Sequence, residues 1–210
     1  MTIREQLSSQ RGDRTEASNL RVVACCLAEP ALLGAIADGL ASPDGALVGD
    51  CAEVLTHVAQ EHPEWVAPHA AALGALLTSK VTRVRWEAMH ALALVTAQAT
   101  DVIAGLLPRL GDILRGDRSV IVRDYAVDAV GNYAATSAEA AQEAYPLLMD
   151  ALTLWDGKQA PHALEGLANV ARARPALANP LREVAMRYAD DRRGRARRAA
   201  RALLKATQPA

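Results

Sequence analysis

Residues Asp117–Ala134, DRSVIVRDYAVDAVGNYA, decide the fold of this chain. Small and aliphatic residues recur there at helical spacing and form one apolar face: Val122, Ala126, Ala129, Val130 and Tyr133. The opposite face carries polar residues: Arg123, Asp124, Asp128 and Asn132. One helix of this kind cannot bury its apolar face alone, so the stretch predicts further helices of the same pattern.

The same pattern recurs along the chain. Aligned on Ala126, related stretches lie 36 to 38 residues apart and align at Cys51, Ala88, Ala163 and Ala199. A second helix is expected before each copy, at about 30–41, 63–79, 101–115, 137–154 and 180–189. One more helix is expected at 15–28. Five copies at a nearly constant period predict an all-α fold, a right-handed solenoid of about five helical hairpins.

Prolines recur at one phase of this repeat, 34 to 40 residues apart: Pro30, Pro68, Pro108, Pro146 and Pro180. Proline is tolerated in the first turn of a helix, as expected for Pro30 and Pro180. Pro108 and Pro146 lie inside apolar helical patterns and predict bent helices. At the helix boundaries, Thr136 and Glu139 have capping-box spacing, and Asp117 is expected to order the turn before its own helix.

The repeats resemble HEAT repeats, through the proline-bearing first helix, the aspartate turn and a Val-Arg-x-x-Ala second helix. The third copy matches best, with Pro108, Asp117, Val122, Arg123, Ala126, Ala129 and Val130. The resemblance implies a structural role for Arg85 and Arg123 at the turns. It also implies a lead and capping helix at 1–29, an array at 30–206 (30–62, 63–99, 100–136, 137–174, 175–206) and a frayed tail at 207–210.

The composition is that of a globular protein, with 51% hydrophobic and 22% charged residues. Aromatic residues make up 3% and Phe is absent, which favours closely packed helices. The net charge of −1 demands neither a nucleic acid nor a membrane as partner. No signal peptide or transmembrane segment is visible, and Cys25, Cys26 and Cys51 are expected to be buried, reduced thiols. A cytoplasmic protein is therefore expected.

In arrays of the HEAT type the second helices line the concave face. The resemblance therefore implies a partner-binding groove lined by Trp86, Glu87, His90, Asp124, Asp128, Asn132, His162 and Glu165. The middle of this row is acidic to neutral, which favours a protein or peptide segment of basic character. An ordinary solvated face is the alternative. Trp86 is expected to be an exposed binding hot spot or to pack over the edge of a neighbouring repeat, whereas Trp65 and Trp155 are expected to lock repeat junctions.

Positive charge is concentrated at the end of the chain. Residues 182–210 hold nine of the 23 Lys and Arg residues but three of the 24 Asp and Glu residues. The last helix supplies a possible anion-binding set: Arg195, Arg198, Arg201 and Lys205. These residues predict either a nucleic-acid-binding surface or the polar cap that ends a repeat array. No aromatic residue interleaves with them, which weakens base stacking as a mechanism.

The sequence does not favour an enzyme. HEAT-like iron hydroxylases carry repeated His-Glu dipeptides, which are absent here, and His162 with Glu165 has no second pair to complete a metal site. HEAT-like alkylpurine DNA glycosylases use groove tryptophans and an aspartate. Trp86 with Asp124 or Asp128 imitates that set without a basic lining. We therefore expect a scaffold with no catalytic residue, no cofactor and no metal, and nucleic-acid binding is the alternative function.

Overall fold

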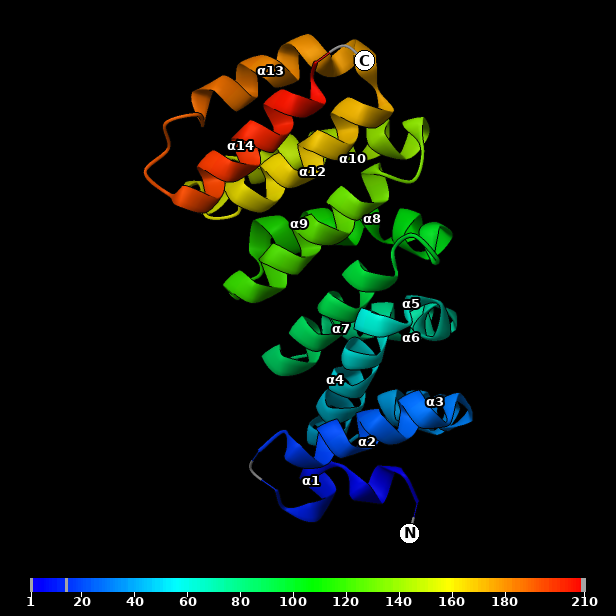
Figure 1. The fold of residues 1–210 in the computed structure, drawn as a ribbon. Coiled ribbons are helices and arrows are strands. Elements are labelled where there is room, and N and C mark those ends of the chain that lie inside the picture. The colour runs from blue at the N-terminus through cyan, green and yellow to red at the C-terminus, as the bar shows by residue number, and fades with distance from the viewer. Residues whose placement is uncertain (1, 14, 209–210) are drawn as a thin grey trace. The chain divides into compact units, whose positions relative to one another are not determined.

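The computed structural model describes residues 2–13 and 15–208, and this part of the chain forms helices and no strand. It divides into two compact units, Met1–Val102 and Ile103–Ala210, called unit 1 and unit 2 below. The all-α repeat fold expected from the sequence is confirmed. Within each unit, the second helices of neighbouring copies pack on one another, and helices adjacent in the sequence pack beside them (Figure 1).

Unit 1 contains the helices of the first two predicted copies and those that precede them. Its elements, with 3₁₀ helices marked η, are η1 (Arg4–Gln6), α1 (Ser8–Arg11), α2 (Ala17–Ala28), η2 (Pro30–Leu32), α3 (Leu33–Asp38), η3 (Gly39–Ala41), α4 (Gly45–Glu61), α5 (Pro63–Val66), η4 (Ala67–His69), α6 (Ala70–Ala75), η5 (Leu76–Thr78) and α7 (Thr82–Val95). The two expected first helices at 30–41 and 63–79 are thus each broken into short α and 3₁₀ segments. The second helices, α4 and α7, are continuous and pack on each other.

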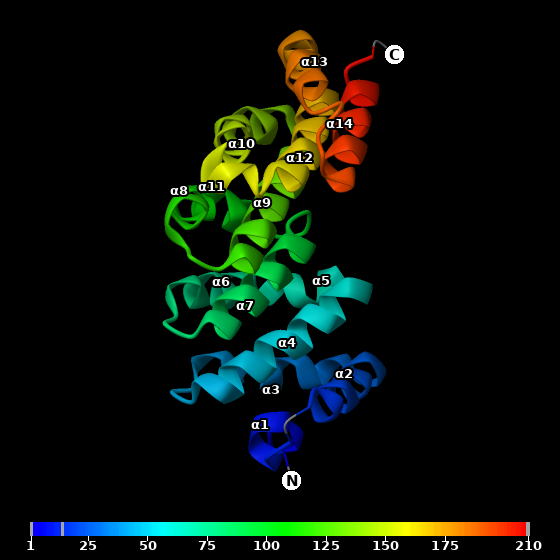
Figure 2. The same cartoon turned by 90° about the vertical axis from the view of Figure 1, so that its left-hand side faces the viewer.

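Unit 2 holds the other three copies. Its elements are α8 (Thr100–Gly116), which begins at the end of unit 1, α9 (Val120–Ala134), α10 (Ala138–Ala151), α11 (Leu154–Gly157), α12 (Ala160–Ala173), η6 (Pro175–Leu177), α13 (Ala178–Arg187) and α14 (Gly194–Ala206). Helix α12 packs on α9, α10 and α14 (Figure 2). Helices α8 and α10 each continue through their internal proline, Pro108 or Pro146, as one helix.

The core is built from small residues, as the scarcity of aromatics predicts. Ala126, Ala129 and Ala163 are completely buried where α9 and α12 pack together. The two helices approach closely at Gly131 and Gly166, where a Cβ added to Gly131 would lie 2.8 Å from the Gly166 Cα atom. Only glycine lets the two backbones come this close, so this pair fixes how α9 and α12 cross.

The turns before α7 and α9 share one geometry. The Asp117 side chain accepts a 2.8 Å hydrogen bond from the Ser119 backbone N–H, and the Arg123 guanidinium donates to the Asp117 carbonyl. In the copy before it, Ser79 takes the place of Asp117, and Arg85 donates to its carbonyl at 2.8 Å. Both arginines thus bond a turn carbonyl six residues earlier, and Asp117 orders its turn as expected.

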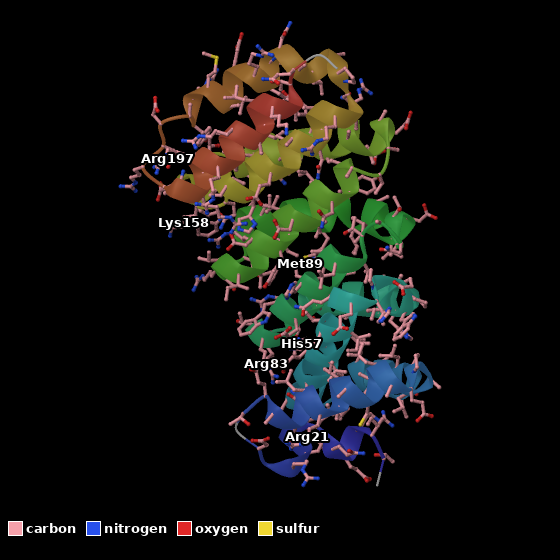
Figure 3. The ribbon with its side chains drawn as sticks, in the orientation of Figure 1. Arg21, His57, Arg83, Met89, Lys158 and Arg197 are labelled. Carbon is pink, nitrogen blue, oxygen red and sulfur yellow. The ribbon has the colours of Figure 1, made fainter. Side chains whose placement is uncertain are left out.

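The last copy has the same turn, but the turn lies one residue later in the sequence than the alignment at Ala199 predicts. The Asp191 side chain accepts from the Arg193 backbone N–H at 2.8 Å, and Arg197 Nη1 donates to the Asp191 carbonyl at 2.6 Å. Arg197, labelled in Figure 3, is therefore the counterpart of Arg123. The copy aligns at Ala200, and the alignment at Ala199 was wrong by one residue.

Three further expectations are corrected. The cap of α10 is Ser137, whose hydroxyl accepts from the Ala140 N–H at 3.0 Å, and not Thr136, which bonds the Tyr133 carbonyl. Among the cysteines, Cys26 and Cys51 are buried, but Cys25 is exposed. In the expected frayed tail, Thr207 is buried. Residues 1 and 14 of the expected lead and residues 209–210 of the tail lie outside the described residues.

Candidate functional site

The strongest polar site of unit 1 is a set of buried charges between α2, α4 and α7, called the Arg83 cluster. Arg83, labelled in Figure 3, lies at the start of α7. Its Nη2 atom lies 2.8 Å from the Asp50 Oδ1 atom and also pairs with the Glu53 carboxylate. Asn19 on α2 donates to the same two carboxylates, at 3.0 Å to Asp50 and 2.8 Å to Glu53. The Ser9 backbone N–H donates to Asp50 at 2.7 Å. Three separate segments thus hold two carboxylates on one face of α4.

These carboxylates are almost removed from water. Asp50 is 1% exposed and Glu53 is 7% exposed, whereas the Arg83 side chain is 39% exposed. Burial acts to raise the pKa of Asp50, but hydrogen bonds from Ser9, Asn19 and Arg83 outweigh it and lower the pKa below its usual value. Asp50 is therefore a fixed negative charge that the surrounding donors keep ionised.

A cavity of about 480 Å³ opens beside the Arg83 cluster. Its volume lies within the range of small-ligand and side-chain pockets. Of the ionisable residues in its wall, five are acidic and one is basic: Asp13, Glu16, Asp50, Glu53, Glu87 and Arg83. The indole of Trp86 forms another part of the wall. The cavity therefore combines an excess of negative charge with one aromatic surface.

Glu87 shows that this negative charge is incompletely compensated. The side chain is 7% exposed, and its Oε1 atom accepts a 2.7 Å hydrogen bond from Trp86 Nε1. Burial and the nearby charge of Glu53 raise the pKa of Glu87 to about 7, against the smaller opposite effects of Trp86 and Arg83. A cation placed in the cavity would relieve this repulsion.

Unit 2 carries an equivalent set of residues, called the Arg195 cluster. Arg195 Nη1, at the start of α14, lies 2.8 Å from His162 Nε2, and Arg195 Nη2 lies 3.3 Å from the Glu165 carboxylate. His162 Nδ1 in turn lies 2.6 Å from the Asp128 carboxylate. Because the guanidinium can only donate, His162 Nε2 accepts from it, and Nδ1 then carries the proton that Asp128 accepts. Arg195, His162 and Asp128 thus form one directed chain of hydrogen bonds.

The structure divides the sequence-predicted binding residues between the two units. Trp86, Glu87 and His90 belong to α7 of unit 1; Asp124, Asp128 and Asn132 of α9 and His162 and Glu165 of α12 belong to unit 2. Two of the eight, Glu87 and His162, are buried rather than presented on a surface. Trp86 is half-buried against Glu87 rather than fully exposed, and Asn132 and Glu165 are exposed.

None of the five residues of the Arg83 cluster was among the predicted site residues: Ser9, Asn19, Asp50, Glu53 and Arg83. Arg83 had a detectable signal, because it lies 33 residues after Asp50, as Arg195 lies 33 residues after His162. Asn19 and Ser9 had none. They come from segments before the first repeat, where the periodic alignment gives no position for them.

The basic residues of the last helix differ in how they are engaged. All four predicted anion-binding residues, Arg195, Arg198, Arg201 and Lys205, are exposed, but Arg195 also bonds His162 and Glu165. Two other arginines nearby serve the turn: Arg193 pairs with Asp191 at 2.9 Å, and Arg197 bonds the Asp191 carbonyl. Much of the positive charge of this segment is thus engaged inside unit 2.

Trp155 and Trp65 both make local contacts at helix junctions. Trp155 lies in the turn between α10 and α12, where Trp155, Asp156 and Gly157 all adopt positive φ values. Its indole N–H donates to the Leu114 carbonyl at 2.8 Å, and the Arg123 guanidinium stacks 4.1 Å above its ring. Trp65 has a ring partner too, since His62 stacks on it with centroids 3.7 Å apart.

Among residues 2–13 and 15–208, two groups of side chains have ligand atoms close enough to hold a metal ion: Glu16, Glu53 and His57 in unit 1, and Asp128, His162 and Glu165 in unit 2. Each group has internal partners. Glu53 already accepts from Asn19 and Arg83, and His162 uses both ring nitrogens for Asp128 and Arg195. We assign a metal to neither group.

Comparisons with known proteins agree with this architecture. No protein-family model matches the sequence, and no curated protein sequence matches it. Among solved structures, a designed armadillo repeat protein in complex with peptide (KR)4 has a TM-score of 0.76 at 18% identity, with 98% of each chain covered. Computationally designed armadillo repeat proteins for modular peptide recognition give 0.73 at 20%, again with 98% of each chain covered. An engineered protein gives 0.73 at 21%, with 98% of this chain and 87% of that chain covered.

These likenesses show that the chain has the fold of armadillo-like helical repeat proteins. Among the described helices, none has both the length and the apolar run needed to cross a membrane.

Proposed function

We propose that this chain is a non-enzymatic repeat scaffold that binds a basic peptide segment of a partner protein, and that the cavity beside the Arg83 cluster anchors one basic side chain of it. The observation that carries the proposal is the composition of the cavity wall: five acidic residues, one arginine and the indole of Trp86 around 480 Å³. A cationic side chain satisfies both features, since carboxylates attract it and an aromatic face stabilises it.

The fold supports the same proposal. Two of the similar structures are, by their descriptions, designed armadillo proteins: one made for modular peptide recognition and one bound to the peptide (KR)4. The acidic wall in unit 1 gives this chain a charge complementary to such a peptide. Complementary charge improves both specificity and the association rate. The groove-lining roles of His90, Asp124, Asp128, Asn132 and Glu165 belong to this proposal as secondary contacts. His162 does not, because it is buried and engaged with Asp128 and Arg195.

Nucleic-acid binding through the last helix has less support. Arg195 is exposed but already bonds His162 and pairs with Glu165, which reduces the charge that it offers to a phosphate. The other exposed residues of the predicted set are Arg198, Arg201 and Lys205. A glycosylase-like site would need Trp86 together with Asp124 or Asp128. Trp86 bonds Glu87 within unit 1, and Asp124 and Asp128 face His162 within unit 2.

Calorimetric titration of the full chain tests the proposal. The ligands are an eight-residue peptide of alternating Lys and Arg and a matched peptide with Gln at each basic position. We expect saturable binding of the basic peptide alone. Trp86→Ala combined with Glu53→Gln should weaken it at least about tenfold, since the variant loses the aromatic surface and one charge.

Glu61→Gln is the matched control, because Glu61 is an exposed carboxylate at the end of the same helix α4 and lies outside the cavity. It should leave the affinity unchanged. Absence of binding by the basic peptide, or an equal loss of affinity in Glu61→Gln, would refute the proposal.

A further inference from the structure

A second cavity, in unit 2, has the opposite charge. It measures about 1040 Å³ and lies between the ends of α12 and α14 and the start of α13. Three cationic side chains from three different helices reach its wall: Arg172 from α12, Arg182 from α13 and Lys205 from α14. Among the described residues, no acidic side chain lines it.

The cationic groups of this cavity are not neutralised within the described part of the chain. Arg172 Nη1 donates to the Asn169 amide oxygen at 2.8 Å, and Arg182 Nη2 donates to the Thr207 carbonyl at 3.1 Å. Neither partner carries a charge, and these three side chains form no ion pair with any described carboxylate. The two hydrogen bonds orient the guanidinium groups and leave their remaining N–H donors for a ligand.

The rest of the wall limits what can bind. Pro175 and Ala178 give it an apolar part, while the Asn179 amide adds another donor. The part of its lining that the structure describes contains no aromatic side chain on which a nucleic-acid base could stack. The volume is at the upper end of the range for small-molecule sites. Guanidinium groups bind carboxylate and phosphate oxygens in pairs, which a single lysine does not do.

We propose that this cavity binds a small anion with at least two negative charges, held by Arg172, Arg182 and Lys205. The site is independent of the peptide-binding cavity in unit 1 and uses one of the four cationic residues that the sequence singled out in α14. The anionic groups are phosphates or carboxylates, which share this charge and bidentate geometry and are told apart by experiment.

Calorimetry of the full chain with inorganic pyrophosphate and, separately, with citrate tests this site. We expect saturable binding of at least one anion at physiological ionic strength, and the tighter of the two identifies the chemistry. Arg172→Gln and Lys205→Gln should each weaken that binding about tenfold or more, because each removes a converging charge. Arg201→Gln is the matched control: it removes an exposed arginine of α14 that does not line the cavity, and it should change the affinity less than twofold.

Arg172 and Lys205 also lie in the last turns of their helices, where a cation stabilises the helix end. Thermal unfolding separates the two roles, since the anion should raise the midpoint for the natural chain and for Arg201→Gln but not for Lys205→Gln. The proposal fails if neither anion binds, or if Arg201→Gln weakens binding as much as Lys205→Gln. Unchanged peptide binding in Lys205→Gln keeps this test separate from that of unit 1.

Discussion

The Arg83 cluster and the Arg195 cluster are the same arrangement in two chemical forms. Corresponding residues of the two clusters are separated by 112 residues, or three repeats. Arg83 corresponds to Arg195, Asp50 to His162 and Glu53 to Glu165. In both clusters an arginine at the start of a second helix bonds two residues of the second helix in the preceding copy. These two residues lie 33 and 30 positions before the arginine in the sequence. The repeat geometry therefore sets the contact, and the residue types decide what it does.

The decisive difference is at the position of Asp50 and His162. Asp50 adds a second buried carboxylate beside Glu53, so Arg83 is shared between two acids and the cavity stays negative. His162 accepts a hydrogen bond from Arg195 and donates one to Asp128, so in the Arg195 cluster each donor already has an acceptor. The residue type at this one repeat position thus decides whether the cluster borders a negatively charged cavity, as at Asp50, or only connects two helices, as at His162.

Removing the arginine of each cluster should give the largest contrast. Arg83→Met leaves the buried Asp50 and Glu53 without their cation and should lower the free energy of unfolding by about 3 kcal/mol. This value is at the low end for buried pairs because Arg83 itself is partly exposed. Urea unfolding of the full chain, followed by circular dichroism, measures it. A loss below about 1 kcal/mol would show that Asn19 and Ser9 alone satisfy the two carboxylates.

Glu87 should make the cavity of unit 1 sensitive to pH. Its pKa is raised from 4.5 to about 7, so the protonated group is favoured in the folded chain. Its contribution to stability is therefore complete below pH 4.5 and is lost as the pH rises through about 7. The affinity for the basic peptide should instead increase with pH. Glu87 becomes ionised as the pH rises, and its charge then adds to the attraction by Glu53 and opposes the repulsion by Arg83. We expect affinity to rise about threefold to tenfold between pH 6 and pH 8.

Glu87→Gln is the test of this pH dependence, since Gln keeps the size and an acceptor for Trp86 Nε1. In this variant the affinity should be almost constant between pH 6 and pH 8. Calorimetric titrations at several pH values in buffers of equal ionic strength measure it. If Glu87→Gln keeps the full pH dependence, another group is responsible.

The sequence predicted the fold because the repeat is periodic. The second helices around Cys51, Ala88, Ala126 and Ala163 could be located from small apolar residues at constant spacing. The register of the last copy failed, because an arginine-rich, alanine-rich helix aligns almost equally well at Ala199 and Ala200. The turn hydrogen bonds of Asp191 decide between them, and they are a feature of three-dimensional structure.

The candidate site was less predictable. Trp86 and Glu87 were found from their position on the second helix, but their mutual hydrogen bond and the burial of Glu87 were not. Asn19 enters the Arg83 cluster from outside the periodic part of the chain. The predicted row of acidic residues treated all positions as solvent-facing, whereas burial differs from copy to copy with the helices that pack beside it.

The smallest effect is expected for Arg195→Met, the counterpart of Arg83→Met. The Arg195 and Glu165 side chains are 48% and 47% exposed, so water replaces most of what their ion pair provides. His162 loses a donor at Nε2 but keeps Asp128, and the free energy of unfolding should fall by less than about 1 kcal/mol. The same urea experiment compares the two variants directly. An equal loss of unfolding free energy in both variants would contradict this prediction. It would mean that the contribution of these arginines to stability depends on the common repeat geometry and not on the burial of Asp50 and Glu53.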